Sequence, residues 1–241
     1  MFPIRDHNPS DRAPLVTYAL IAANIVMFLL TLPYAGPDSA ARWEQLALYP
    51  ALVSDGHPLP GLLSHMFLHA GLLHLAGNML FLWIFGDNLE DQMGHLPYLA
   101  FYLTCGLAAA GAQILSDPDS VVPMVGASGA IAGVMGGYLL MFPRARVDVI
   151  VILLILVRRF TIPAWVTLGA WFALQVGSVW AAPAAEGGVA YWAHSGGFVA
   201  GLVLTVPLFL RRGGARFWNR TGGHPPHTPR QYPTRFPQIR R

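Results

Sequence analysis

Six apolar stretches divide the chain, and their lengths constrain the fold more than any other feature of the sequence. Each has roughly 18 to 24 residues, about what an α-helix needs to cross a lipid bilayer. Of the 241 residues, 54% are hydrophobic and 11% are charged, against about 25% charged in an ordinary soluble domain. The chain is therefore predicted to be an all-α polytopic membrane protein. Its six predicted transmembrane helices are residues 15–32, 62–85, 96–115, 122–142, 162–182 and 189–210.

The arginines predict how these helices are oriented. All fifteen basic residues are arginine, and with six spans fourteen of them lie on the side of the two termini. Only Arg42 lies on the other side. Because positively charged loops stay in the cytoplasm, both termini are predicted to be cytoplasmic. A chain of five or seven spans would place the arginines of one terminus outside.

The same pattern divides the chain into three parts and limits its partners. Residues 1–14 are predicted to be a cytoplasmic tail, 15–210 a six-helix membrane domain, and 211–241 an Arg/Pro-rich tail that is disordered. A pI near 9.3 would suggest nucleic acid in a soluble protein, but the arginines lie mainly at membrane edges and in the tail, so no nucleic acid is expected. The expected location is a bacterial inner membrane, as a multi-pass protein.

Three local features complete the predicted organisation. The segment Val147–Val157 is apolar, but it is too short to span as a helix, so we expect a re-entrant or interfacial piece. Gly86, followed by Asp87 and Asn88, is typical of a helix stop. The single Cys105 excludes an intramolecular disulfide and is expected to be a packing residue.

Polar residues interrupt three of the predicted spans. Ser128 stands among glycines in the fourth span, about 7 Å below Pro123 if a helix starts there. His194 lies at a similar depth in the sixth span, and His74 and Asn78 share one helix face in the second. A serine in hydrocarbon often bonds only to its own helix, but polar groups from three spans in one half of a bilayer predict a functional site.

These residue types suit nucleophilic catalysis. Ser128 would be the nucleophile, and His194 would be the general base, in a dyad without an orienting carboxylate. His74, Asn78 and the Ser128 backbone N–H are candidate donors to an oxyanion. Gly126 and Gly129 would allow the backbone and a substrate to approach closely.

The motifs resemble those of the rhomboid intramembrane serine proteases. The matching elements are His74-Leu75-Ala76-Gly77-Asn78, Gly126-Ala127-Ser128-Gly129, and Ala193-His194 followed by Gly196-Gly197. Each lies in a separate span, and the resemblance covers residues 15–210. His65, His69 and Glu90 also match the family pattern. The chain departs from it in having Pro60-Gly61 in place of a Trp-Arg pair, and Ala132 where an aromatic residue often packs on the catalytic histidine.

The resemblance implies a six-helix serine endopeptidase (a hydrolase) with Ser128 as nucleophile, His194 as base, and His74 and Asn78 as oxyanion donors. Its substrates would be single-span membrane proteins cut in or near their transmembrane segments in the lipid bilayer. No cofactor and no metal are implied, and the oligomeric state stays open.

Other interpretations remain for these residues. His74 and Asn78 could be polar contacts between helices, and His65 and His69 could ligate a metal, although no acidic residue accompanies them. Glu90 is expected to be structural. The glycines at 129, 133 and 137 and at 197 and 201 are typical of close helix packing. The whole protein could be a catalytically inactive rhomboid-like binder of membrane clients, which would not need both Ser128 and His194. It could also be a small transporter, although no internal repeat is found.

Overall fold

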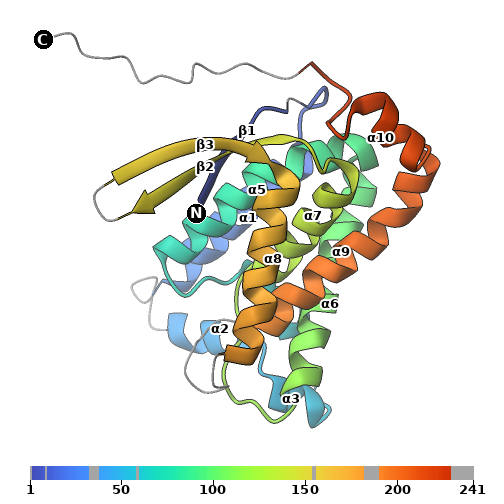
Figure 1. The fold of residues 1–241 in the computed structure, drawn as a ribbon. Helices are drawn as coiled ribbons and strands as arrows, with labels where there is room; N and C mark the ends of the chain where they lie inside the picture. The colour runs from blue at the N-terminus through green and yellow to red at the C-terminus, as the bar shows by residue number, and fades with distance from the viewer. Residues whose placement is uncertain are drawn as a thin grey trace, which may run out of the picture.

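A computed structural model describes residues 2–8, 10–32, 38–57, 60–153, 156–181 and 190–228, which form a helical bundle with a small sheet at one end (Figure 1). The longer helices are α1 (Leu15–Thr31), α5 (Leu72–Met93), α6 (His95–Ser116), α7 (Ser128–Met141), α8 (Ala164–Ala181) and α9 (Tyr191–Arg211). The shorter ones are α2 (Ser39–Leu46), α3 (Pro50–Ser54), α4 (Gly61–Ser64), the 3-10 helix η1 (His65–Phe67) and α10 (Ala215–Thr221).

The helices have the lengths and composition of a membrane protein. Within the described ranges, α6 and α9 are each long and apolar enough to cross a bilayer. The pair formed by residues 61–67 and α5 would count as a third span, with a 90° bend at its break. α1 and α7 are shorter apolar helices. The protein is therefore a mostly helical membrane protein, and the count of six spans remains a prediction.

The second predicted span differs from the structure at both of its ends. Its first residues form α4 and η1, and the chain bends sharply before α5 begins at Leu72. The predicted stop at Gly86 is wrong, because α5 continues to Met93. Gly86 instead allows close packing, since a Cβ there would lie 2.8 Å from Tyr98 Oη and 3.0 Å from Thr17 Oγ1.

Glu90 has the structural role that was predicted for it, but it lies within α5 rather than in a loop. Its carboxylate accepts hydrogen bonds from the backbone N–H groups of Val16 and Thr17, both at 2.8 Å. It also accepts one from Thr17 Oγ1 at 2.7 Å. The first N–H groups of a helix have no partner within it, so Glu90 caps α1 and ties it to the end of α5.

The fourth predicted span is also shorter than the apolar run. α7 begins at Ser128, and the preceding residues are extended rather than helical. Met124 and Leu48 exchange two backbone hydrogen bonds, of 2.7 and 3.1 Å, which hold this extended segment against the residues after α2. The 14 residues of α7 make a helix about 21 Å long. Its amino end therefore lies inside the bundle, and the predicted helix start at Pro123 is wrong.

A three-stranded antiparallel sheet makes the prediction of an all-α fold wrong. Its strands are β1 (Phe2–Asp6), β2 (Arg146–Leu153) and β3 (Leu156–Pro163), in that order. The described residues of the segment 147–157, which was predicted as a re-entrant or interfacial piece, belong to the strands β2 and β3. Its run of valine and isoleucine favours strands, because β-branched side chains suit a pleated surface better than a helix.

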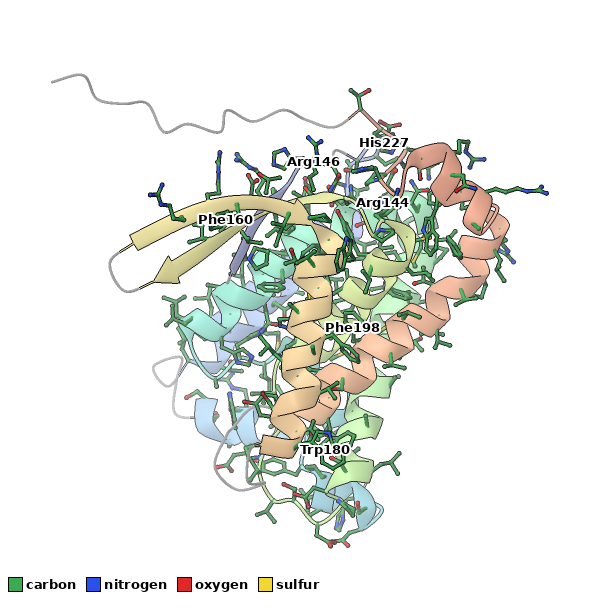
Figure 2. The ribbon with its side chains drawn as sticks, in the orientation of Figure 1. Arg144, Arg146, Phe160, Trp180, Phe198 and His227 are labelled. Carbon is green, nitrogen blue, oxygen red and sulfur yellow. The ribbon has the colours of Figure 1, made fainter. Side chains whose placement is uncertain are left out.

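The C-terminal segment is partly ordered, which corrects the predicted disorder of residues 211–241 for the part that the structure describes. In α10, Phe217 is buried, and Trp218 Nε1 donates to the Leu140 carbonyl at 3.0 Å. His227 binds both Asp11 and Asp91, with N–O distances of 3.0 and 2.9 Å. Residues 229–241 lie outside the described residues. The N-terminal segment, the connection after α7 and the C-terminal segment thus meet at one end of the bundle, with Trp180 at the other (Figure 2).

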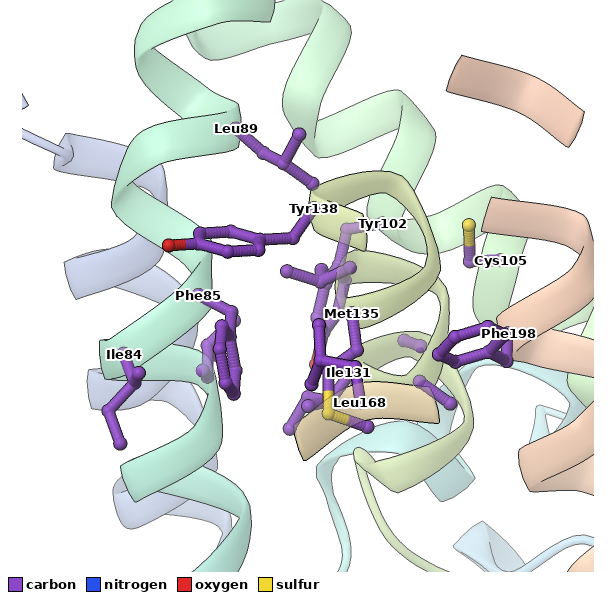
Figure 3. Close-up of a cluster of buried hydrophobic side chains, with 14 of the residues drawn as sticks. Ile84, Phe85, Leu89, Tyr102, Cys105, Ile131, Met135, Tyr138, Leu168 and Phe198 are labelled. Carbon is purple, nitrogen blue, oxygen red and sulfur yellow. The ribbon is translucent and has the colours of Figure 1, made fainter. Parts of the chain in front are cut away.

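The core is organised around α7. Figure 3 shows Ile131, Met135 and Tyr138 of α7 among side chains of α5, α6, α8 and α9. Gly197 and Gly201 of α9 lie directly against the backbone carbonyls of Gly129 and Gly133. The predicted packing of small residues is therefore confirmed, and it brings α7 and α9 closer together than side chains would allow. Cys105 is buried here as a free thiol.

Candidate active site

Ser128 is the first residue of α7, and the loop before it is firmly positioned. The Gly126 N–H donates to the His65 carbonyl at 2.9 Å, and Gly126 has φ +124°. That backbone conformation favours glycine. The chain can therefore turn abruptly from an extended segment into the helix, and this turn presents the Ser128 side chain at the helix's amino end.

His194 lies on α9 beside this serine. Its Nε2 is 2.7 Å from Ser128 Oγ, which is a direct hydrogen bond. Ala193 and Gly197, on either side of His194 in α9, are buried. The close contact of Gly197 with Gly129 explains how residues 66 positions apart come within hydrogen-bonding distance.

A third residue, which the sequence motifs did not indicate, completes the contacts of the histidine. Gln175 of α8 places Oε1 2.8 Å from His194 Nδ1. Trp171, one turn earlier on α8, has its ring centroid 5.8 Å from that of His194 at an interplanar angle of 41°. The aromatic neighbour expected from α7, where Ala132 stands, thus comes from α8. The available signal was a single glutamine in an apolar span, four residues after a tryptophan.

His74 and Asn78 approach the same place from α5. A Cβ added to Gly126 would lie 2.8 Å from His74 Nε2 and 3.5 Å from Ser128 Oγ, so the imidazole and the hydroxyl face the same glycine. The Asn78 amide donates to the His74 carbonyl at 3.0 Å, within its own helix. His69 packs edge-on against His74, with ring centroids 5.1 Å apart.

A cavity of about 640 Å³ opens onto Ser128 and His194 and onto His74 and Asn78. All six residues predicted for the site line it: Ser128, His194, His74, Asn78, Gly126 and Gly129. Trp171 of α8 forms part of another wall. The structure therefore brings together every predicted site residue, and among the described residues of this set Ser128 and His194 are the pair whose side chains are hydrogen-bonded to each other.

The electrostatic character of the site comes from neutral groups and from the end of a helix. Among the described residues, no side chain caps α7, so the N–H groups of its first turn stay available. The amino end of a helix carries a partial positive charge. Together with the His74 and Asn78 side chains, it can stabilise negative charge developing beside Ser128.

The two upstream histidines occupy structural positions. His65 Nδ1 donates to the Gly61 carbonyl at 2.7 Å, while the His65 carbonyl holds Gly126. Within the described part of the chain, neither ring nitrogen of the buried His69 has a hydrogen-bond partner. Over the same residues, no group of three or more His, Cys, Asp or Glu side chains is placed to hold a metal ion.

Comparison with known proteins covers most of the chain. Residues 58–211 match the family model of the Rhomboid domain. "Rhomboid protein 1, mitochondrial" of Saccharomyces cerevisiae is 30% identical over 197 residues, which are 78% of this chain and 51% of that protein. "RHOMBOID-like protein 5" of Arabidopsis thaliana is 34% identical over 183 residues, 73% of this chain and 52% of that protein.

A bacterial relative is also similar. "Rhomboid protease GluP" of Bacillus subtilis is 35% identical over 130 residues, which are 52% of this chain and 24% of that protein. The chain thus spans about half, or less, of the length of these three relatives.

Proposed function

Because the chain belongs to the rhomboid family, we propose that it is an intramembrane serine endopeptidase that acts through Ser128 and His194. The observation that carries this proposal is the 2.7 Å hydrogen bond between Ser128 Oγ and His194 Nε2. The bond lies in a cavity at the amino end of a helix. A serine hydroxyl is a weak nucleophile on its own, and a hydrogen-bonded imidazole is the common means of activating it.

The reaction proceeds in two halves. Ser128 Oγ attacks the carbonyl carbon of the scissile peptide while its proton passes to His194 Nε2. The tetrahedral intermediate then collapses, the C–N bond breaks, and the imidazolium returns the proton to the leaving amine. Water, deprotonated by His194, attacks the resulting ester and releases the acid product, which restores the Ser128 hydroxyl.

Negative charge on the former carbonyl oxygen needs donors that are already in place. The Ser128 backbone N–H is the nearest candidate, because it belongs to the unpaired first turn of α7. The His74 imidazole and the Asn78 amide line the same cavity. We assign both as oxyanion donors, with Asn78 exchanging its bond to the His74 carbonyl for one to the substrate.

The membrane arrangement follows the charge pattern. Six spans with both termini in the cytoplasm agree with the fourteen-to-one division of the arginines. The contact between Asp11 and His227 supports this arrangement, since it joins the two terminal segments at one end of the bundle. The catalytic residues would then lie in the half of the membrane away from the cytoplasm. The expected location of this multi-pass protein is a bacterial inner membrane.

Substrates would be single-span membrane proteins, cut in or near their transmembrane segments. The cavity is lined by residues of α5, α7, α8 and α9 and by the segment that precedes α7, so we expect a peptide to reach it from the bilayer or from the nearby membrane surface. Neither a cofactor nor a metal ion is part of this proposal.

A reconstituted cleavage assay tests the proposal. Purified protein in liposomes is incubated with a transmembrane model substrate, and the products are followed by gel and mass spectrometry. Wild type is expected to cleave, and Ser128→Ala and His194→Ala are expected to be inactive. Ser195→Ala and His57→Ala are the matched controls, since Ser195 is next to His194 but does not line the cavity, and His57 is exposed. Cleavage that persists in Ser128→Ala would overturn the proposal, and binding without cleavage by wild type would favour a client-binding protein.

A further inference from the structure

α8 lies on the outside of the bundle and presents one face to the catalytic histidine. Its outer side is exposed, with Trp165, Leu174 and Trp180 at 57%, 68% and 85% exposure. Its inner side packs on α9, where the rings of Phe172 and Phe198 stack with centroids 4.5 Å apart. Figure 1 shows α8 running alongside α9. The two inner residues that contact His194 therefore belong to a helix that contributes neither the nucleophile nor the base.

We propose that Gln175 and Trp171 are positioning residues, which hold His194 in the ring orientation and tautomer that general-base catalysis requires. This inference rests on the proposed function, because it assigns a role to His194 in that reaction. It replaces the predicted dyad by a chain of three hydrogen-bonded side chains, Ser128, His194 and Gln175, contributed by α7, α9 and α8.

The tautomer follows from which atom of the amide faces the ring. A neutral imidazole has one N–H donor and one acceptor nitrogen. Gln175 Oε1 faces Nδ1 at 2.8 Å, and a carbonyl oxygen can only accept, so the proton is on Nδ1. Nε2 then carries the lone pair, and at 2.7 Å it accepts the Ser128 hydroxyl proton. With the opposite tautomer, Nε2 would donate to the serine and could not act as its base.

An amide suits this place better than a carboxylate in one respect and less well in another. A charged group within an apolar span is costly, and Gln175 avoids that cost. However, an amide can turn over and offer its NH2 group to Nδ1, which a carboxylate cannot do. A glutamate at position 175 would therefore select the productive tautomer and would also stabilise the protonated imidazole.

Trp171 restricts the ring by contact rather than by a hydrogen bond. Its ring centroid is 5.8 Å from that of the imidazole and 6.1 Å from that of Phe198, so it packs against one side of His194. Ala132, the corresponding position on α7, is fully buried and offers only a methyl group. The tryptophan supplies the flat apolar surface that α7 lacks.

The groups facing His194 are few enough for a pH profile to be informative. α5 presents His74, whose charge acts on His194. α7 presents Ser128, α8 presents the uncharged Gln175 and Trp171, and α6 packs Ala108 and Ala112 against Gly196. Of these described groups, His194 and His74 are the two with ionisable side chains.

The test measures kcat, KM and the pH dependence of kcat for Gln175→Leu and Gln175→Glu in liposomes. Gln175→Leu keeps the side-chain volume but removes the acceptor, so kcat is expected to fall about 10- to 100-fold with KM little changed. Gln175→Glu is expected to retain activity, with the acid limb of its profile about one pH unit or more higher. Trp171→Phe is expected to retain more activity than Trp171→Ala.

Thr167→Val is the matched control, because Thr167 is a buried polar residue two turns earlier on the same helix. It is expected to keep both kcat and the acid limb of wild type. An unshifted acid limb in Gln175→Glu, or unchanged kcat in Gln175→Leu, would overturn the assignment of Gln175. Ser128→Ala and His194→Ala are assayed in parallel, since activity in either of them would instead refute the proposed function.

Discussion

Two polar clusters lie in different parts of the molecule, and they differ in how completely the chain satisfies them. In the sheet, Asp148 Oδ2 binds Arg5 Nη2 at 2.9 Å, while Oδ1 binds His7 Nε2 at 2.9 Å and Thr161 Oγ1 at 2.6 Å. In the bundle, Ser128 and His194 face a cavity of about 640 Å³, with the first N–H groups of α7 unused within the helix. The polar groups of the first cluster bind one another, whereas those of the second face the cavity and are available to a ligand.

The two clusters also differ in charge, because the sheet cluster is ionised and the cluster in the bundle is neutral. Burial opposes ionisation of Asp148, but hydrogen bonds from Thr161, His7 and Arg5 outweigh it and lower the pKa of this carboxyl to about 2. The cluster in the bundle instead consists of a hydroxyl, an imidazole and an amide, which need no countercharge in an apolar segment. We therefore expect substitutions in the sheet cluster to affect stability, and substitutions in the site to affect activity.

The largest effect is expected from Ser128→Ala. The rate of cleavage should fall by about 10⁴-fold or more, because the nucleophile is gone. The free energy of unfolding should change by less than about 1.5 kcal/mol, since only one hydrogen bond is lost. Cleavage rates and thermal unfolding in the same detergent measure both quantities. A strongly destabilised Ser128→Ala would show that the hydroxyl is structural.

Asp148→Ala should have the opposite effect. Removing the carboxylate leaves Arg5 and His7 without this partner and should cost about 2 to 4 kcal/mol of stability. This is about 1 kcal/mol less than is typical of a broken buried pair, because the Arg5 side chain is 31% exposed. The kcat of the folded fraction should match wild type. Thermal unfolding measures the loss of stability, and active-site titration gives the kcat of the folded fraction. A loss of kcat per titrated site would mean that the clusters are coupled.

Asn78→Ala tests whether a polar residue inside the bundle belongs to the site. If Asn78 is an oxyanion donor, its replacement by alanine should lower kcat about 100-fold, with KM little changed. Asn24→Ala is the matched control, because the Asn24 amide also donates to the carbonyl four residues earlier in its helix, at 2.8 Å, but lies away from the cavity. If both variants lose stability and neither loses kcat, Asn78 is a helix contact.

The smallest expected effect concerns Asp6, at the end of β1. Burial raises the pKa of this carboxyl to about 6, although hydrogen bonds from Asn8 and Tyr138 oppose the rise. The folded state thus holds this proton more tightly than the unfolded chain, so its contribution to stability falls as the pH rises from about 4 to about 6. Asp6→Asn should remove that slope from a plot of unfolding temperature against pH, and an unchanged slope would exclude Asp6 as its source.

The contribution of Asp148 to stability should change with pH in the opposite direction, and it should do so at lower pH. Because its pKa is lowered to about 2, its contribution is complete above about pH 4 and is lost as the pH falls towards 2. Asp6→Asn should leave this acid limb in place, so the two carboxyls can be distinguished within a single series of thermal unfolding curves.

Several of the helices, and the pairing of Ser128 with His194, could be predicted from the sequence for a simple reason. A span needs about 20 apolar residues, and this requirement marks α1, α6, α8 and α9 to within a few residues of their ends. Ser128 and His194 stand in separate spans, each beside glycines, and glycines allow the helices that carry them to pack closely.

The features that were missed depend on contacts between distant segments. The start of α7 at Ser128 depends on backbone bonds from Leu48 and His65, which no local pattern records. The sheet forms only when β1 pairs with β2, which lies about 145 residues later in the chain. Gln175 is an ordinary glutamine in an apolar run, and only the packing of α8 on α9 gives it a role.

The most direct test of the catalytic centre is covalent labelling of the nucleophile. Wild-type protein in liposomes is treated with a fluorophosphonate, and the modified peptide is identified by mass spectrometry. We predict a single adduct on Ser128, formed about 100-fold or more slowly in His194→Ala, because the base that deprotonates the hydroxyl is missing. An adduct on a different residue, or equal labelling of Ser128 in His194→Ala, would contradict the assignment of Ser128 and His194 as nucleophile and base.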